Sequence, residues 1–171
     1  MMNLFEIINK VEMSKDFKRF KKENPGAYFC AAFFIIDYET PAEKKQLDYF
    51  VSSADVMTFA INQEGNEITP AKAELPKKEK IPAIGMQVVK LSEDQAMEIA
   101  KKESEIGEFT KVIAVLQNLE GRDIWNLSCM RGLQMMRYHV SASDGKVMKK
   151  EKINLMDMMK IEPGKTPDYI Q

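Results

Sequence analysis

His139 is the single histidine of the chain, and imidazole is the side chain best suited to acid–base chemistry near neutral pH. A general base also needs a carboxylate or a nucleophile within reach. In the strand that the sequence predicts here, the same-face neighbours of His139 are Arg137 and Ser141, and an adjacent guanidinium disfavours the protonated imidazole. We therefore interpret His139 as a surface residue on a solvated sheet face rather than as a catalytic base.

Other reactive or metal-binding groups are few. Cys30 and Cys129 are the two cysteines, and each lies in its own apolar segment, which favours two buried thiols over a disulfide or a zinc site. No spaced acidic loop supports a magnesium or calcium site made of carboxylates alone. The sequence also lacks a Gly-rich phosphate loop, a nucleophile elbow and a dinucleotide fingerprint. It therefore predicts no catalytic residue, no metal site and no cofactor.

Two further groups of side chains could contact a ligand. Trp125 could stack against one, but its alternation with Leu127 and Cys129 favours packing in a core. The segment 155–161, LMDMMKI, is rich in methionine, and Asn154 could cap a short helix there. Its methionines either fold back onto the sheet or form an adaptable contact surface. The candidate partner contacts are Met156, Met158, Met159, Arg137 and His139.

Composition excludes several classes of function. The chain has 171 residues, of which 44% are hydrophobic and 30% charged, as is ordinary for a globular protein. Its 25 Lys and Arg nearly balance 26 Asp and Glu, so neither nucleic acid nor an anionic membrane is expected as a partner. The start lacks the pattern of a signal peptide, and no apolar run is long enough to span a bilayer. We expect a cytoplasmic protein.

The chain aligns with itself at an offset of 78 to 80 residues. Residues 21–23, KKE, fall on 101–103, also KKE, and the apolar run 33–36 falls on 113–116. Turn sequences containing glycine follow the third strand pattern of each half. The offset changes only where loops are expected, so the order of elements agrees throughout.

Each half reads as a helix followed by four strands. In the second half, Ser92 is the expected N-cap of a helix that ends near Gly107. The strands predicted there are 109–119, 124–130, 133–142 and 147–153. In the first half the pattern predicts a helix within 4–23, broken near Met13–Ser14, and strands at 27–37, 47–53, 56–63 and 67–75.

These patterns predict an α+β fold made of two tandem helix-plus-antiparallel-sheet repeats, each with the order α-β-β-β-β. We expect the first repeat at 1–75, a linker at 76–90 and the second repeat at 91–153. A short Met-rich helix and a C-terminal tail should follow at 154–171. The first strand of each half, around 29–36 and 112–116, is apolar on both faces. We therefore expect the two repeats to pack together, or the chain to dimerise, across these strands.

The second half resembles the PepSY-like family. The residues that carry the resemblance are 91–102, LSEDQAMEIAKK, then 124–127, IWNL, and 140–147, VSASDGKV. They are similar to that family's helix opening, its tryptophan-bearing central strand and its closing hairpin. The resemblance covers about residues 90–153 and implies a cystatin-like arrangement of a helix and a curled antiparallel sheet. It also implies a non-catalytic domain of a kind associated with proteases, cell envelopes and the regulation of secreted enzymes.

Two departures bear on the family's function. Many relatives are secreted or tethered to a membrane, and this chain shows neither signal. Ser141 is small and neutral where the family's closing hairpin is commonly acidic. The fold therefore transfers from the resemblance better than the function does.

Three functional hypotheses follow. The first is a non-catalytic binding or regulatory module, an inhibitory one included, that acts on a protein partner through a sheet face or an edge strand. The second is a structural protein that assembles as a homodimer. The third is an enzyme or a small-molecule-binding protein that uses a cavity between helix and sheet. Its polar lining would come from Tyr138, Tyr49, Ser53 and Thr58. We favour the first hypothesis.

Overall fold

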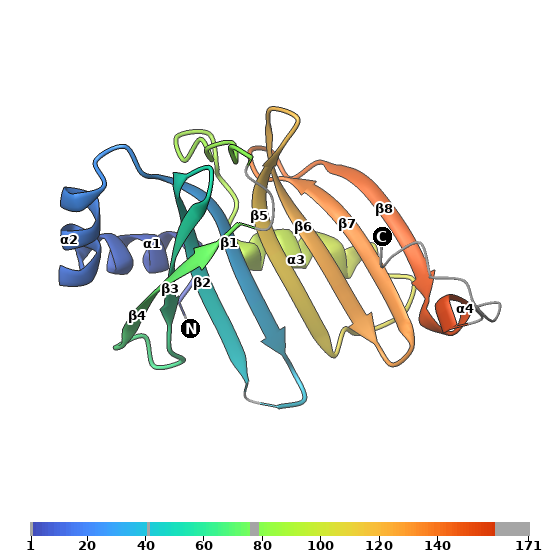
Figure 1. Ribbon diagram of the computed structural model, residues 1–171. Helices are drawn as coiled ribbons and strands as arrows, with labels where there is room; N and C mark the ends of the chain where they lie inside the picture. The colour runs from blue at the N-terminus through green and yellow to red at the C-terminus, as the bar shows by residue number, and fades with distance from the viewer. Residues whose placement is uncertain (1, 41, 76–78, 160–171) are drawn as a thin grey trace.

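The fold was analysed in a computed structural model, which describes residues 2–40, 42–75 and 79–159. Its centre is one eight-stranded antiparallel sheet with the strand order β4-β3-β2-β1-β5-β6-β7-β8 (Figure 1). The first four strands are β1 (Tyr28–Asp37), β2 (Glu43–Ser52), β3 (Asp55–Ile61) and β4 (Ile68–Glu74). The last four are β5 (Lys111–Leu119), β6 (Arg122–Arg131), β7 (Gln134–Ser141) and β8 (Val147–Asn154). The helices are α1 (Leu4–Met13), α2 (Lys15–Glu23), α3 (Glu93–Lys102) and the short α4 (Leu155–Met159).

The predicted fold of two tandem helix-plus-sheet repeats is wrong, because all eight strands belong to a single sheet. Strand β1 pairs with β5 in an antiparallel register that runs from Ala31–Gln117 to Asp37–Lys111. Each of these strands would otherwise be an unpaired apolar edge, and an exposed edge of that kind is prone to aggregation. Pairing them satisfies their backbone hydrogen bonds and leaves only β4 and β8 as sheet edges.

The two halves do meet at β1 and β5, but by pairing at their edges and not by packing of their apolar faces, while dimerisation across these strands stays a prediction. The two strands meet edge to edge, so each presents one face to the helices and one face to the opposite side of the sheet. Phe34 and Ala114, on the helix side, are fully buried. Phe33 and Val115, on the other side, are only partly buried. Among the described residues, the second apolar face is therefore left partly exposed.

The first helical segment breaks at Ser14, as the sequence predicts. The Ser14 hydroxyl donates to the carbonyl of Val11 at 2.6 Å and accepts from the N–H of Phe17 at 3.2 Å, so one residue ends α1 and caps α2. Phe17 then packs against the rings of Tyr49 and Phe59, with centroids 5.0 and 5.5 Å apart. The break thus lets α2 turn its aromatic side onto β2 and β3.

The core lies between the helices and one face of the sheet. Trp125 is fully buried there, as predicted, and its indole Nε1–H donates to the carbonyl of Leu91 at 2.9 Å. The segment predicted as a linker takes part in this core, because Ile84 and Val89 are buried within it. Gly145 closes the β7–β8 turn with φ +79°, and a Cβ at this position would lie 2.9 Å from Ile99 of α3. This turn therefore requires glycine for its backbone conformation and for the close approach of α3.

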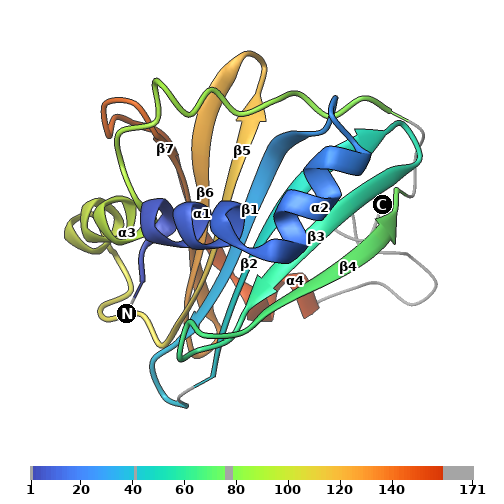
Figure 2. The same cartoon turned by 90° about the vertical axis from the view of Figure 1, so that its left-hand side faces the viewer.

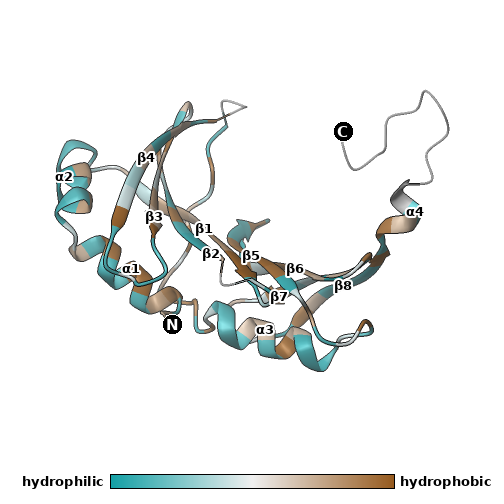
Figure 3. Cartoon of the chain, turned by 90° about the horizontal axis from the view of Figure 1, so that it is seen from below, coloured by the Kyte–Doolittle hydropathy of each residue, from teal (hydrophilic) through white to brown (hydrophobic). Residues whose placement is uncertain are grey.

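The sheet is bent into an open trough (Figure 3). Helices α1, α2 and α3 lie along its outer side, with α1 and α3 arranged end to end (Figure 2). The inner side carries none of these three helices. We call this inner side the helix-free face. Its accessible side chains come from alternate positions of the strands, beginning with Phe33 of β1 and Val115 of β5.

Candidate functional site

Among the described residues, the two buried charged side chains, Glu93 and Lys45, lie where the start of α1 meets α3 and β2. Glu93, in the first turn of α3, is fully buried, and both of its carboxylate oxygens accept from the backbone N–H of Leu4 at 3.0 Å. Glu93 thus lies at the positive ends of two helices at once. Burial, followed by the neighbouring Asp94, raises the pKa of Glu93 to about 7, while hydrogen bonding to Leu4 and the charge of Lys45 act in the opposite direction. This carboxylate joins the two helices and is closed off from ligands.

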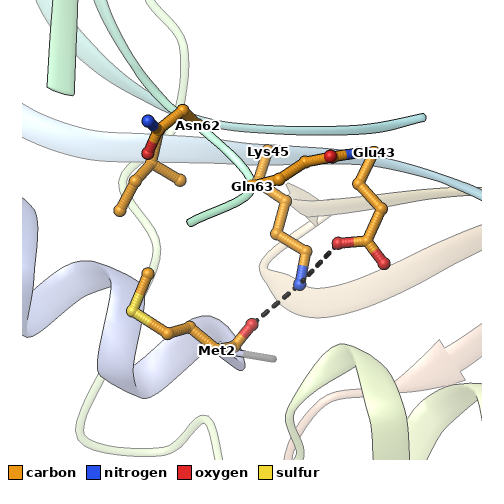
Figure 4. Close-up of a pocket in the computed structure, with 6 residues that line it drawn as sticks. Met2, Glu43, Lys45, Asn62 and Gln63 are labelled. Carbon is orange, nitrogen blue, oxygen red and sulfur yellow. Dashed lines mark hydrogen bonds and ion pairs between the residues drawn. The ribbon is translucent and has the colours of Figure 1, made fainter. Parts of the chain in front are cut away.

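Lys45 of β2 is the buried cation nearest to this junction (Figure 4). Its ammonium donates to the carbonyl of Met2 at 2.7 Å and lies 3.9 Å from a carboxylate oxygen of Glu43. It also lies 5.6 Å from the centre of the Phe34 ring, within the range of a cation–π interaction. The hollow beside it has a volume of about 10 Å³, close to that of a single water molecule. Lys45 therefore holds the start of the chain against the sheet.

We expect Glu93 to make stability depend on pH. Because its pKa is raised on folding, the native state binds the proton more tightly than the unfolded state, and stability falls as pH rises from about 4.5 to about 7. The free energy of unfolding, measured with urea, should fall between about pH 5 and about pH 8 in the unmodified chain. In the Glu93→Gln variant this fall should be smaller by about 1 to 3 kcal/mol.

Two variants serve as controls for this measurement. Glu98→Gln changes an exposed carboxylate of the same helix and should leave the pH profile as it is. Asp48→Asn should also reduce the dependence of stability on pH, independently of Glu93, because burial raises the pKa of Asp48 to about 6. A Glu93→Gln profile identical to that of the unmodified chain would contradict the role assigned to Glu93.

The four hydroxyl residues considered for an internal cavity do not converge. The Tyr49 hydroxyl donates to Glu12 at 3.3 Å, and the Thr58 hydroxyl donates to the carbonyl of Ala71 at 3.0 Å. Ser53 lies in the exposed turn between β2 and β3. Tyr138 is fully buried, and its hydroxyl has no hydrogen-bond partner among the described residues. The four groups therefore do not form one polar lining between helix and sheet.

Metal-binding and thiol chemistry find little support in the described part of the chain. Cys30 and Cys129 are free and buried, and burial raises the pKa of both thiols to about 12. Within residues 2–40, 42–75 and 79–159, no group of three His, Cys, Asp or Glu side chains could hold a metal ion. In the same ranges no helix has the length and apolar character needed to cross a bilayer.

The helix-free face has an apolar centre. Phe33 and Ile35 of β1 lie directly opposite Val115 and Ile113 of β5, and all four side chains are partly exposed. We call these four residues the apolar strip. The two-sided apolar pattern of the sequence indicated its members, but their meeting across the β1–β5 pair was not predicted. Partly exposed apolar side chains gathered in this way are typical of an interaction surface.

Polar and cationic side chains lie beside the apolar strip on β6, β7 and β8. His139 is paired with Asn126, which is paired in turn with Val115, so one row of the sheet joins the predicted contact His139 to the apolar strip. Arg137 occupies the neighbouring row and lies 3.9 Å from Glu151 of β8. Burial, then the charges of Lys149 and Arg137, lower the pKa of His139 and favour the neutral imidazole.

A hollow of about 730 Å³ lies on this side of the apolar strip. Arg122, His139 and Lys149 line it together with one acid, Glu120. The apolar part of the lining is Leu119, Ile124 and Met148. Arg122 was missed at the sequence level, because it begins β6 and its contact with Met148 of β8 depends on the arrangement of the sheet. Charges of this kind are suited to holding an anion beside an apolar surface.

A second hollow, of about 530 Å³, lies at the C-terminal end of α3 and is lined in part by Tyr38, Lys101 and Ser104. The Lys101 ammonium is already engaged there, since it lies 3.3 Å from Glu98 and 5.4 Å from the centre of the Tyr38 ring. This hollow is therefore the weaker candidate for binding an anion.

Of the three predicted methionine contacts, the structure describes the side chain of Met156. Met156 lies on α4, which follows the edge strand β8, and its side chain is 47% exposed. The side chains of Met158 and Met159 lie outside the described residues. Of the five predicted contacts, the structure places Arg137 and His139 next to the apolar strip.

Both sheet edges carry features that oppose pairing with another strand. In β4, Pro70 lacks the backbone N–H that a new strand would need, and Lys72 adds a charge. Strand β8 contains lysines at 149, 150 and 152. Lysine and proline are the residues by which natural sheets protect their edges. The helix-free face is therefore a better candidate for partner binding than either edge strand.

Comparisons with known proteins inform the fold. The chain is similar to a solved structure described as a putative lipoprotein from Clostridium difficile 630, with a TM-score of 0.60 and 14% sequence identity. The match covers 81% of this chain and 90% of the clostridial one. No family model matches the sequence, and neither does any curated protein. None of these comparisons connects the chain with a catalytic family, and the resemblance to PepSY-like domains stays a prediction.

Proposed function

We propose that the protein is a non-catalytic binding or regulatory module that holds a protein partner on its helix-free face. The observation that carries the proposal is the apolar strip, Phe33, Ile35, Ile113 and Val115, which lies at the centre of the sheet and is left partly exposed. Covering these four side chains on association would remove apolar surface from water. The polar side chains of β6 and β7 beside the strip would fix the orientation of the partner.

The arrangement of the sheet supports a face rather than an edge as the contact. A segment lying across the helix-free face, the inner side of the bent sheet (Figure 3), would contact several neighbouring strands at once. Edge pairing, in contrast, is opposed by Pro70 on β4 and by the lysines of β8. The sequence left a sheet face or an edge strand as the contact, and we propose the sheet face.

Site-specific photocrosslinking in cells of the source organism tests this proposal. A photoreactive phenylalanine at Ile113 reports on the apolar strip, and the same residue at Leu133, which is 51% exposed in the β6–β7 turn, is the matched control. We expect a discrete adduct with one protein from position 113 and none of the same mass from position 133. Phe33→Thr with Val115→Thr should abolish this adduct while keeping the sheet, because threonine retains a high β-propensity.

Two outcomes would contradict the proposal. Adducts of equal mass and yield from positions 113 and 133 would show that the helix-free face has no preference for a partner. A single adduct with the mass of two copies of this chain would indicate homodimer assembly instead, and light scattering after size exclusion would then show a dimer.

A further inference from the structure

We propose that the helix-free face recognises an acidic peptide segment. In this arrangement a carboxylate of an extended partner segment docks among Arg122, His139 and Lys149, and an apolar side chain of the same segment covers Phe33 and Val115. The inference rests on the proposed function and specifies the chemistry of its partner.

The register of the sheet sets the spacing between the two contacts. His139, Asn126, Val115 and Phe33 lie on one row across β7, β6, β5 and β1. Neighbouring strands are about 4.8 Å apart, so His139 lies about 10 Å from Val115. A segment in the polyproline II conformation has three residues per turn and advances about 3.1 Å per residue, so side chains three apart in sequence lie on one face at about this separation. An acid followed three residues later by a large apolar residue fits both contacts.

The charges around the hollow are complementary to an acid. Arg122 and Lys149 contribute two cations to its lining and Glu120 contributes one anion. On the adjoining row, Glu151 lies 3.9 Å from both Arg137 and Lys149, so this one acid is shared between two cations. The described groups facing the hollow therefore carry a net positive charge in a chain whose formal net charge is -1. Such a local excess attracts a carboxylate without attracting polyanions to the whole surface.

His139 adds a dependence on pH. The groups that face it are Asn126 on β6, Arg137 on its own strand and Lys149 on β8, with Arg122 and Glu120 lining the same hollow. Burial and the two nearby cations favour the neutral imidazole in the free protein. A docked carboxylate would oppose these charges and raise the pKa of His139. Binding would then take up a proton, so affinity should increase as pH falls below neutral.

Nuclear magnetic resonance of the full chain tests the inference with two blocked tetrapeptides, acetyl-Glu-Ser-Ser-Phe-amide and acetyl-Gln-Ser-Ser-Phe-amide. The Glu peptide should bind roughly fivefold more tightly than the Gln peptide, since one partly exposed charge pair distinguishes them. It should shift the amide signals of β1, β5, β6 and β7 and raise the pKa of His139. Lys149→Gln should remove most of the difference between the peptides, and His139→Gln should remove its dependence on pH.

Lys152→Gln is the matched control, because Lys152 is on the same strand as Lys149 but on the opposite side of the sheet. It should leave both affinities unchanged. Equal affinity for the two peptides, or no binding of either up to about 10 mM, would overturn acid recognition. Inorganic phosphate binding as tightly as the Glu peptide would also overturn it, since the apolar contact would then contribute nothing. The crosslink from position 113 is independent of these results and decides the proposed function separately.

Discussion

Fragments 1–75 and 79–171 are each expected to fail to fold cooperatively when they are produced alone. Separation exposes β1 along the register from Ala31 to Asp37 and exposes β5 in the same way. It also removes the carboxylate of Glu93 from the first turn of α1. Each fragment would keep only part of the core, and small domains with an incomplete core are marginally stable. Circular dichroism and urea unfolding should therefore show broad transitions or none.

The control for the fragments is the full chain, cut only after it has folded. A full chain that is first folded and then cut at a protease site placed within 76–78 should stay together, because the β1–β5 pairing and the shared core hold both parts. Mixing the two separate fragments in equal amounts should restore a cooperative transition. A sharp unfolding transition from either isolated fragment as a monomer would show that the continuous sheet is unnecessary for stability.

Trp125→Ala should cost about 3 to 5 kcal/mol of stability, the range measured for large aromatic side chains deleted from cores. The indole is fully buried, lies 6.0 Å from the Phe34 ring and donates to the carbonyl of Leu91. Its removal leaves a cavity at the contact between the two halves of the sheet, together with an unpaired carbonyl. For a chain of this length the loss corresponds to a fall in Tm of roughly 6 to 20 °C.

Two further variants separate the contributions to this loss. Trp125→Phe keeps an aromatic ring but removes the hydrogen bond, so it should cost less than the alanine variant, about 1 to 3 kcal/mol. Leu133→Ala, at an exposed turn, should change stability by less than about 0.5 kcal/mol. Thermal unfolding followed by circular dichroism measures all three. A Trp125→Ala loss as small as that of Leu133→Ala would contradict the central place of the indole in the core.

The local elements could be predicted from the sequence because they depend on short-range patterns. The alternation 125, 127, 129 marked the buried face of β6, and Ser92 marked a helix start through capping. The predicted strands agree with the observed ones to within a few residues, β2 differing most at its start. These features are properties of neighbouring residues, and the single sequence contains them directly.

The joining of the two halves could not be predicted in the same way. Pairing β1 with β5 connects residues about 80 positions apart, and the apolar pattern of both strands fits packing across a face as well as pairing at an edge. Glu93 and Lys45 were not identified from the sequence as buried charges, since nothing local shows that the start of α1 meets α3 and β2. Arg137 and His139 were identified as contacts because they lie on the same face of the predicted strand. Arg122 could be added only from the structure, which brings β6 and β8 together around one hollow.

The pairing of β1 with β5 also has a consequence for synthesis of the chain. β1 ends at Asp37, but the strand that covers its open edge is complete only at Leu119. At about 5 to 20 residues per second, the ribosome takes roughly 4 to 16 seconds to make the intervening length. During that time the nascent first half presents an apolar strand without its neighbour, which makes it a natural substrate for chaperones that act near the ribosome exit.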